Sequence, residues 1–186
     1  MKRVGYMGTE GSFSEMAAKE IADMMLFGNA RLVPMTNAKN VLNALLEDEI
    51  SYGVVAIRNT TTGAVSEFIE AFGDTSYEVQ GMCTLPIHHC LFKKSGVDTD
   101  TLTTVASHPQ ALTQTQEKRR KNYPDLTEQA VDDTALAAQM LAEGNLSDTT
   151  AVICSKNAGE KWNLELMEEN IEDSDDNQTI FWMVTV

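Results

Sequence analysis

Short apolar runs alternate with segments whose apolar residues recur at helical spacing along almost the whole chain. The runs VGYM (4–7), RLVPM (31–35) and YGVVAI (52–57) are continuously apolar or β-branched, which is typical of strands covered on both faces. Between them, SFSEMAAKEIADMM (12–25) and NAKNVLNALLEDE (37–49) carry apolar residues at helical spacing. This pattern predicts an α/β fold.

The second half of the chain continues the alternation and suggests two lobes. A long strand-like stretch at 77–92 leads into a second series of elements, and the C-terminal tail is expected to return to the first sheet. We therefore expect two small α/β lobes around a cleft, with residues 1–80 and 160–186 in lobe one and 81–159 in lobe two. Ligands of such folds bind beyond the carboxyl ends of the strands. The second series is expected to contain TTVAS, a helix from about 109, EQAV, a helix from about 133, TAVIC, a helix at 155–162 and two further strands.

Three loop-to-helix junctions carry residues that suit an anion. In GTEGSFSE, Ser12 and Glu15 fit an S-x-x-E capping box, and in SHPQALTQ, Ser107 and Gln110 fit S-x-x-Q. In RNTTTGAVSEF, a Thr-rich turn is expected to open a helix near Thr62. Helix N-termini bind carboxylates and phosphates through their N–H groups and dipole, although capping alone also explains each junction taken singly. The residues by themselves predict an α/β protein with an anion-binding cleft and leave its reaction open.

Composition and charge narrow the function classes. A net charge of −14 argues against general nucleic-acid binding, because phosphate backbones are bound by Lys and Arg in quantity. No apolar run approaches the roughly 18 residues of a membrane span, and no apolar segment follows the basic start MKR, so neither a span nor a secretory signal is expected. The three cysteines form no CxxC pair, which favours reduced thiols in a cytoplasmic protein.

Two patterns that resemble metal sites do not meet the requirements of one. EDSDDN (172–177) begins with EF-hand spacing, but Gln178 stands where the loop needs Gly and Val184 where it needs Glu. A solvated acidic turn is expected there. His88 and His89 are neighbours in a strand-like stretch, so their side chains point to opposite faces and do not share a metal. We expect no metal site.

Five motifs in chain order make the sequence resemble the prephenate dehydratases. Each is weak alone, but five in register across 186 residues are fairly specific. GTEGSFSEMAA resembles the family's GPxGTFSExAA, YGVVAIRNTTTGAV resembles YGVVPIENSxxGxV, VQGMCTLPIHHCLF resembles its central strand, SHPQALTQ resembles SHPQALxQC, and NQTIFWMV resembles the terminal N-x-TRF-x-V.

The resemblance implies a fold and a reaction. Family members have two α/β lobes around a cleft, similar to type II periplasmic binding proteins. They are hydro-lyases of L-phenylalanine biosynthesis that convert prephenate to phenylpyruvate, with loss of carbon dioxide and water and without a cofactor. Many carry a C-terminal ACT domain that binds phenylalanine, and because this chain stops at Val186, that domain is expected to be absent. The resemblance also implies a homodimer. Alternatives are a prephenate decarboxylase that does not aromatise its product, and a non-catalytic protein that binds or senses small carboxylates.

The resemblance also implies roles for individual residues. By the family's pattern, Thr179 directs its hydroxyl at the leaving hydroxide of prephenate, and Asn59, Ser107 and Gln114 orient the substrate. Without the resemblance, Thr179 reads as a polar residue at the start of a strand. Further substrate contacts are expected from Ser12, Thr60, Arg58, His108 and Gln110.

Two charged positions depart from the family's pattern. Position 58 is Arg where the family has Glu, and position 180 is Ile where the family has Arg. Loss of the motif Arg removes a candidate carboxylate clamp, whose bidentate geometry a neutral residue cannot reproduce. We hypothesise that Arg58 restores positive charge to the cleft from the opposite loop. The alternative is a site that has drifted to another ligand, although the retained Thr179 argues against loss of dehydration.

Overall fold

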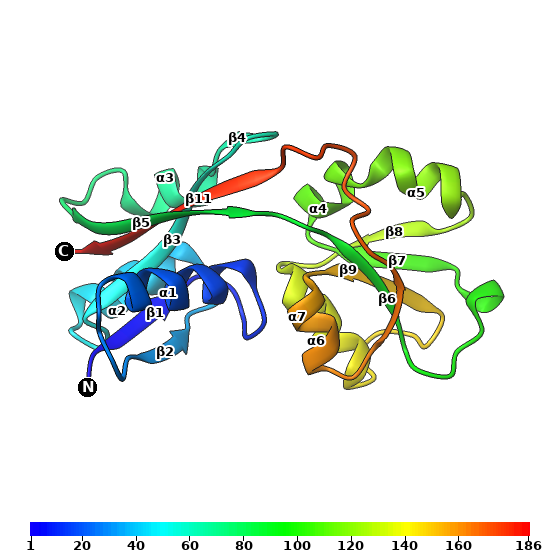
Figure 1. Ribbon diagram of the computed structural model, residues 1–186, viewed down its shortest axis with the longest axis horizontal. Helices are drawn as coiled ribbons and strands as arrows, with labels where there is room; N and C mark the ends of the chain where they lie inside the picture. The colour runs from blue at the N-terminus through cyan, green and yellow to red at the C-terminus, as the bar shows by residue number, and fades with distance from the viewer. The chain divides into compact units, whose positions relative to one another are not determined.

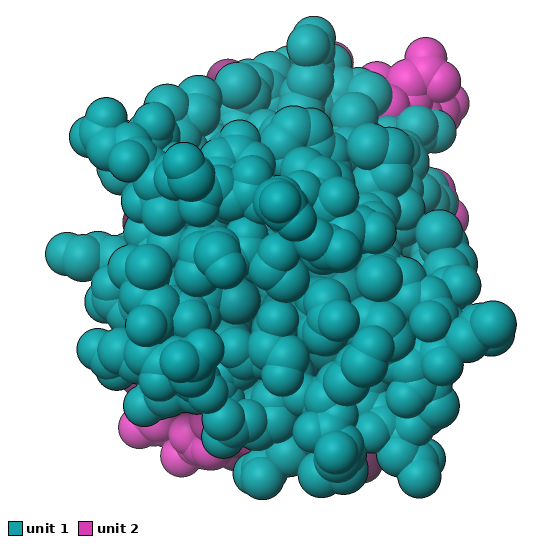
Figure 2. Space-filling model, turned by 90° about the vertical axis from the view of Figure 1, so that its left-hand side faces the viewer, with its two compact units in different colours: residues 1–9, 13–86, 178–186 teal, residues 10–12, 87–177 magenta.

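A computed structural model describes all residues, 1–186, and confirms the predicted α/β class. The strands form two separate sheets. The chain divides into two compact units, which are coloured separately in Figure 2. Unit 1 comprises residues 1–9, 13–86 and 178–186, and unit 2 comprises residues 10–12 and 87–177.

Unit 1 is a six-stranded sheet with helices on both faces (Figure 1). Its elements are β1 (Arg3–Tyr6), α1 (Phe13–Met24), β2 (Arg31–Pro34), α2 (Ala38–Leu46), β3 (Tyr52–Asn59), β4 (Gly63–Ala64), α3 (Ser66–Phe72), β5 (Glu78–Pro86) and β11 (Gln178–Thr185). The order is β2-β1-β3-β11-β5, with β4 paired to β3. The first three strands are parallel, and β11 lies antiparallel between β3 and β5, so the tail returns to the first sheet as predicted.

Two hydrophobic clusters lie on the two faces of this sheet. On one face, Ala17 and Ile21 of α1 pack with Phe181 of β11 and with side chains of β1, β3 and β5. On the other face, Val41 of α2 and Phe72 of α3 pack against β3 and β11. Burial on both faces explains why the runs that became β1 and β3 are continuously apolar in the sequence.

Unit 2 is a five-stranded sheet in the order β10-β6-β9-β7-β8. Its elements are β6 (Cys90–Lys93), a 3-10 turn (Thr99–Thr101), β7 (Thr104–Ser107), α4 (Pro109–Gln114), α5 (Gln116–Asn122), β8 (Thr127–Ala130), α6 (Thr134–Ala142), β9 (Thr150–Cys154), α7 (Lys156–Lys161) and β10 (Glu165–Glu168). Strands β8, β7 and β9 are parallel, whereas β6 pairs antiparallel with β9, and β10 pairs antiparallel with β6.

The helices of unit 2 also pack on the two faces of their sheet. Side chains of α6 and α7 form one cluster with Phe92 of β6, and α4 forms another with β7 and β9. Gly159 permits the close approach of α7, because a Cβ there would lie 2.2 Å from the ring of Phe92. No helix of either unit has the length and apolar character that a bilayer crossing requires.

Three expectations about the elements differ from the structure. The strand-like stretch at 77–92 is two strands, because the residues between β5 and β6 form no ladder. The turn at Thr62 leads into β4, so the following helix begins only at Ser66. The boundaries between the units lie at Pro86 and Gln178 rather than near residues 80 and 160. The first lies later because β5 remains paired with β11 as far as Pro86. The second lies later because β10 pairs with β6 in the sheet of unit 2.

Candidate functional site

Thr179 and Asn59 lie directly opposite each other on two central strands of unit 1. Both side chains are buried, and the Asn59 amide Nδ2 donates a hydrogen bond of 2.9 Å to Thr179 Oγ1. Because Oγ1 is the acceptor in this bond, the hydroxyl proton of Thr179 remains available for donation to another group. The pair therefore presents a hydroxyl donor whose oxygen is held in place.

The other end of the Asn59 amide organises the turn that follows β3. Asn59 Oδ1 accepts from Thr61 N at 2.9 Å, from Thr61 Oγ1 at 2.6 Å and from Thr62 N at 3.2 Å. These bonds fold the chain into a tight turn and thereby fix which end of the amide faces Thr179. The Thr-rich turn thus binds the Asn59 side chain. The expectation that it begins a helix is wrong.

Thr60 fastens the start of β11 to this turn. Its N–H donates to the carbonyl of Gln178 at 2.9 Å, and its hydroxyl accepts from Gln178 N at 2.9 Å. Gln178 directly precedes Thr179, so the three residues Asn59, Thr60 and Thr179 are brought together in unit 1. Thr60 therefore has a structural partner in addition to its expected role as a substrate contact.

Arg58 lies opposite Ile180 in the same ladder. Its side chain is exposed and forms none of the ion pairs of the structure. Neighbours along a strand point to opposite faces, so the Arg58 side chain leaves β3 on the face opposite to that of Asn59. The two positions that depart from the family's pattern thus form one cross-strand pair.

In unit 2, Ser107 and His108 mark the passage from β7 to α4. Ser107 is fully buried, and its hydroxyl donates to the carbonyl of Ile153 at 2.6 Å. His108 is the N-cap, with Nδ1 accepting from Gln110 N at 3.2 Å. The expected capping box with Ser107 as the cap was wrong by one residue, because Ser107 still belongs to β7 and its side chain is bonded to β9.

Gln114 ends α4 and is held by two side chains that sequence reasoning did not connect with it. Its Oε1 lies 2.8 Å from His89 Nε2 and accepts from Asn177 Nδ2 at 3.1 Å. The sequence offers His89 only as an unsuitable metal ligand, and Asn177 only as part of an acidic segment and of a motif. The burial of His89, next to an exposed His88, is the alternation that the strand-like pattern predicts.

Only the middle of the acidic segment before β11 is the solvated turn that the sequence predicts, since residues 174–176 are exposed, whereas Glu172 and Asn177 at its ends are buried. Glu172 is buried, with Oε1 at 2.7 Å from His88 Nδ1 and Oε2 accepting from the His89 N–H at 2.9 Å. Burial by itself raises the pKa of Glu172, but the bonds from His88 and the His89 N–H outweigh it and hold that pKa below its usual value. Asp173 accepts from the N–H groups of Glu117 and Lys118 and so caps α5.

Burial lowers the pKa of the His89 imidazole, although its bond to Gln114 and the charge of Glu172 act in the opposite direction. His89 is therefore neutral near pH 7.

Among the remaining predicted residues, Ser12 is buried and directly precedes α1. The residues that unit 2 contributes to the predicted set are Ser12, Ser107, His108, Gln110 and Gln114.

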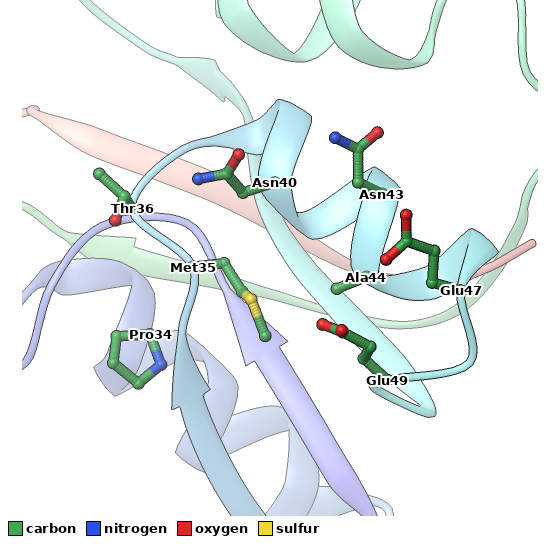
Figure 3. A pocket seen from close by; sticks show the side chains of 8 residues that line it. All are labelled: Pro34, Met35, Thr36, Asn40, Asn43, Ala44, Glu47 and Glu49. Atoms are coloured by element: carbon green, nitrogen blue, oxygen red, sulfur yellow. The ribbon is translucent and has the colours of Figure 1, made fainter.

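A pocket of about 310 Å³ in unit 1 lies away from these residues, beside α2 and the end of β2 (Figure 3). Asn40 and Asn43 line it from α2, and Glu47 and Glu49 follow that helix. Two carboxylates in its lining would repel an anionic ligand. We therefore do not assign the substrate to it.

Comparison with known proteins shows the family to which the chain belongs. The sequence model of the family described as "Prephenate dehydratase" matches residues 4–186. Arogenate dehydratase/prephenate dehydratase 6, chloroplastic, of Arabidopsis thaliana is 34% identical over 182 residues, which are 98% of this chain and 43% of that protein. The chain spans less than half the length of the curated relatives that it matches, between 41% and 48%.

Solved structures show the same fold. Prephenate dehydratase from Arthrobacter aurescens in complex with L-Phe matches with a TM-score of 0.84 and 24% identity, covering 98% of this chain and 59% of that one. A periplasmic substrate-binding protein of an ABC transporter from Coxiella burnetii matches with a TM-score of 0.53 and 14% identity, covering 98% and 84%. The predicted similarity to periplasmic binding proteins is confirmed. With its five motifs in order and a match over residues 4–186, the chain belongs to the prephenate dehydratase family.

Proposed function

We propose that the chain is a prephenate dehydratase, a hydro-lyase that converts prephenate to phenylpyruvate in L-phenylalanine biosynthesis. The observation that carries this proposal is the buried pair of Asn59 and Thr179, in which the threonine hydroxyl is held as an acceptor and keeps its own proton to donate. Membership of the family supports the reaction.

The chemistry requires one well-placed donor. Loss of carbon dioxide from the ring is coupled to departure of hydroxide, a poor leaving group that needs a proton or a strong hydrogen bond. Aromatisation supplies the driving force, so positioning and a single donor suffice. A threonine hydroxyl is a very weak acid, and Thr179 therefore acts as an oriented hydrogen-bond donor to the leaving oxygen while Asn59 holds Oγ1.

Prephenate carries two carboxylates, and we assign their recognition to uncharged donors. Gln114 offers an amide whose oxygen is already occupied by His89 and Asn177. Ser107 gives its proton to the carbonyl of Ile153, so its hydroxyl presents lone pairs and is not counted among these carboxylate donors. The remaining proposed contacts are Ser12, Thr60, His108 and Gln110, with Arg58 as a nearby charge.

The test is turnover by the purified chain. Prephenate would be supplied at mildly basic pH, where spontaneous acid-driven aromatisation is slow, and arogenate would be supplied in parallel because the Arabidopsis relative is named for both. Formation of phenylpyruvate from prephenate is expected. Consumption of prephenate without phenylpyruvate would indicate a decarboxylase that does not aromatise, and tight binding without consumption would indicate a binding protein.

Arg58→Ala is expected to raise the KM for prephenate by about two- to fivefold and to leave kcat unchanged, because a single exposed charge acts through the local potential. The Arg58 side chain is exposed and lies on the opposite face of β3 from Asn59, so it would contribute charge without direct contact. Steady-state kinetics at low and high salt would measure this. Arg31→Ala, an exposed change on the edge strand β2, is the matched control. An unchanged KM in Arg58→Ala would refute the contribution of its charge.

We also propose a cytoplasmic homodimer. Cys83, Cys90 and Cys154 are buried free thiols, which suits a reducing compartment. The dimer is proposed from the family resemblance, and light scattering of the purified chain would measure its mass in solution.

A further inference from the structure

A buried polar chain in unit 2 converges on the amide oxygen of Gln114. His89 Nε2 lies 2.8 Å from Gln114 Oε1, and Asn177 Nδ2 lies 3.1 Å from the same atom. The three residues come from the loop between β5 and β6, the end of α4 and the segment before β11. His89 and Asn177 are both buried, and Gln114 is half-buried.

This arrangement determines which way the amide points. A carbonyl oxygen has two lone pairs, and here His89 and Asn177 direct one donor to each. The opposite orientation would set the NH₂ group of Gln114 against the Nδ2 donor of Asn177, an unfavourable contact of two donors. The Gln114 NH₂ group is therefore directed away from His89 as a donor. His89 must carry its proton on Nε2, and burial, which lowers the pKa of the imidazole, keeps the ring neutral.

Glu172 holds His89 in this position. Its two carboxylate oxygens bind the ring of His88 and the backbone N–H of His89, at 2.7 and 2.9 Å. The backbone is fastened as well, since Ile171 N donates to the His89 carbonyl at 2.9 Å and Asp173 N donates to the Gln114 carbonyl at 2.7 Å. One short segment thus fixes the main chain of both partners.

We propose that His89 is a positioning residue for the reaction: it donates from Nε2 to Gln114 Oε1, turns the Gln114 NH₂ group toward a carboxylate of the substrate, and is itself held by Glu172. This inference rests on the proposed function. It gives the amide the donor polarity that an anionic substrate requires, and it does so without placing a cation in a buried site.

The kinetic test compares two replacements of His89. His89→Leu removes the donor and is expected to lower kcat/KM for prephenate by about 10- to 100-fold, whereas His89→Gln keeps an amide donor and is expected to restore most of that loss. In a Gln114→Ala background, His89→Leu is expected to lower kcat/KM by less than about twofold, because its partner is already gone. Equal losses in both backgrounds, or failure of His89→Gln to restore activity in a folded variant, would overturn the proposal.

A second measurement does not depend on turnover. The ¹⁵N shifts of the His89 ring in the wild-type protein report its tautomer, and a neutral ring protonated on Nε2 is expected. A ring protonated on Nδ1 would make Nε2 an acceptor and would overturn the assigned orientation of Gln114. If the wild type converts neither prephenate nor arogenate, the proposed function and the reaction role fail together, while the tautomer still decides whether His89 orients Gln114.

Discussion

Thr179→Val is expected to lower kcat/KM for prephenate by about 10²–10³-fold, the loss that follows removal of one donor aimed at a developing charge. Valine keeps the branched shape of threonine in β11 and removes only the hydroxyl. Thr179 is buried and bonded through Oγ1 to Asn59, so the loss would arise at this pair. Phenylpyruvate formation by wild type and variant under the same conditions measures the effect.

Thr179→Ser separates the hydroxyl from the rest of the side chain. Serine retains the oxygen but loses the methyl group that restricts its rotation in the strand, so activity within about tenfold of wild type is expected. Loss of the hydrogen bond from Asn59 Nδ2 in Thr179→Val costs about 1–3 kcal/mol of unfolding free energy, so thermal unfolding should be measured together with the kinetics. A valine variant with near-wild-type turnover would remove Thr179 from the mechanism.

The apolar pattern predicted the elements well where both faces of a strand are buried. The runs at β1, β3 and β9 are apolar throughout because helices cover both sides of each sheet. The apolar pattern failed between β5 and β6. Ile87, His88 and His89 alternate in exposure as the residues of a strand do. Their hydrogen-bond partners, however, are Glu172, Asn177 and Ile171, which lie outside any strand. Periodicity reports burial and carries no information about the partner of the backbone.

Sequence motifs identified the candidate residues, but they could not identify the hydrogen-bond partners of those residues. Capping rules located the start of α4 to within one residue but chose Ser107 over His108, because they cannot show that Ser107 bonds to β9. Composition suggested a solvated turn at 172–177, yet Glu172 is buried, because a histidine ring and a backbone N–H distant in sequence meet its carboxylate. Such pairings depend on tertiary structure.

The two departures from the family's pattern also acquire a different meaning. Arg58 and Ile180 are register partners, so the Glu and Arg of the pattern would stand opposite each other as a cross-strand pair of opposite charge. The two changes then amount to one replaced surface pair, of the kind that contributes about 0–1 kcal/mol. Asn59 and Thr179, the adjacent register pair, keep the residues of the pattern.

Asn59→Asp is expected to lower kcat by about 100-fold while the fold persists, because it reverses the hydrogen bond on which the proposed mechanism depends. One carboxylate oxygen would keep the hydrogen bonds from Thr61 and Thr62 that Oδ1 accepts now. The other would replace the Nδ2 donor and accept the Thr179 proton, which is then no longer available to the leaving group. Steady-state kinetics with prephenate, together with thermal unfolding, measure both consequences.

Two further variants isolate the cause of that loss. Asn59→Ala also removes the acceptor of the turn, so it should lose both activity and about 1–3 kcal/mol of unfolding free energy. Asn43→Asp adds the same charge at an exposed position of α2 and should change neither. The donors around position 59 stabilise a carboxylate there, so the aspartate variant should unfold closer to wild type than the alanine variant does. Full activity in Asn59→Asp would show that catalysis does not depend on the direction of this hydrogen bond, and the donor role of Thr179 would have to be abandoned.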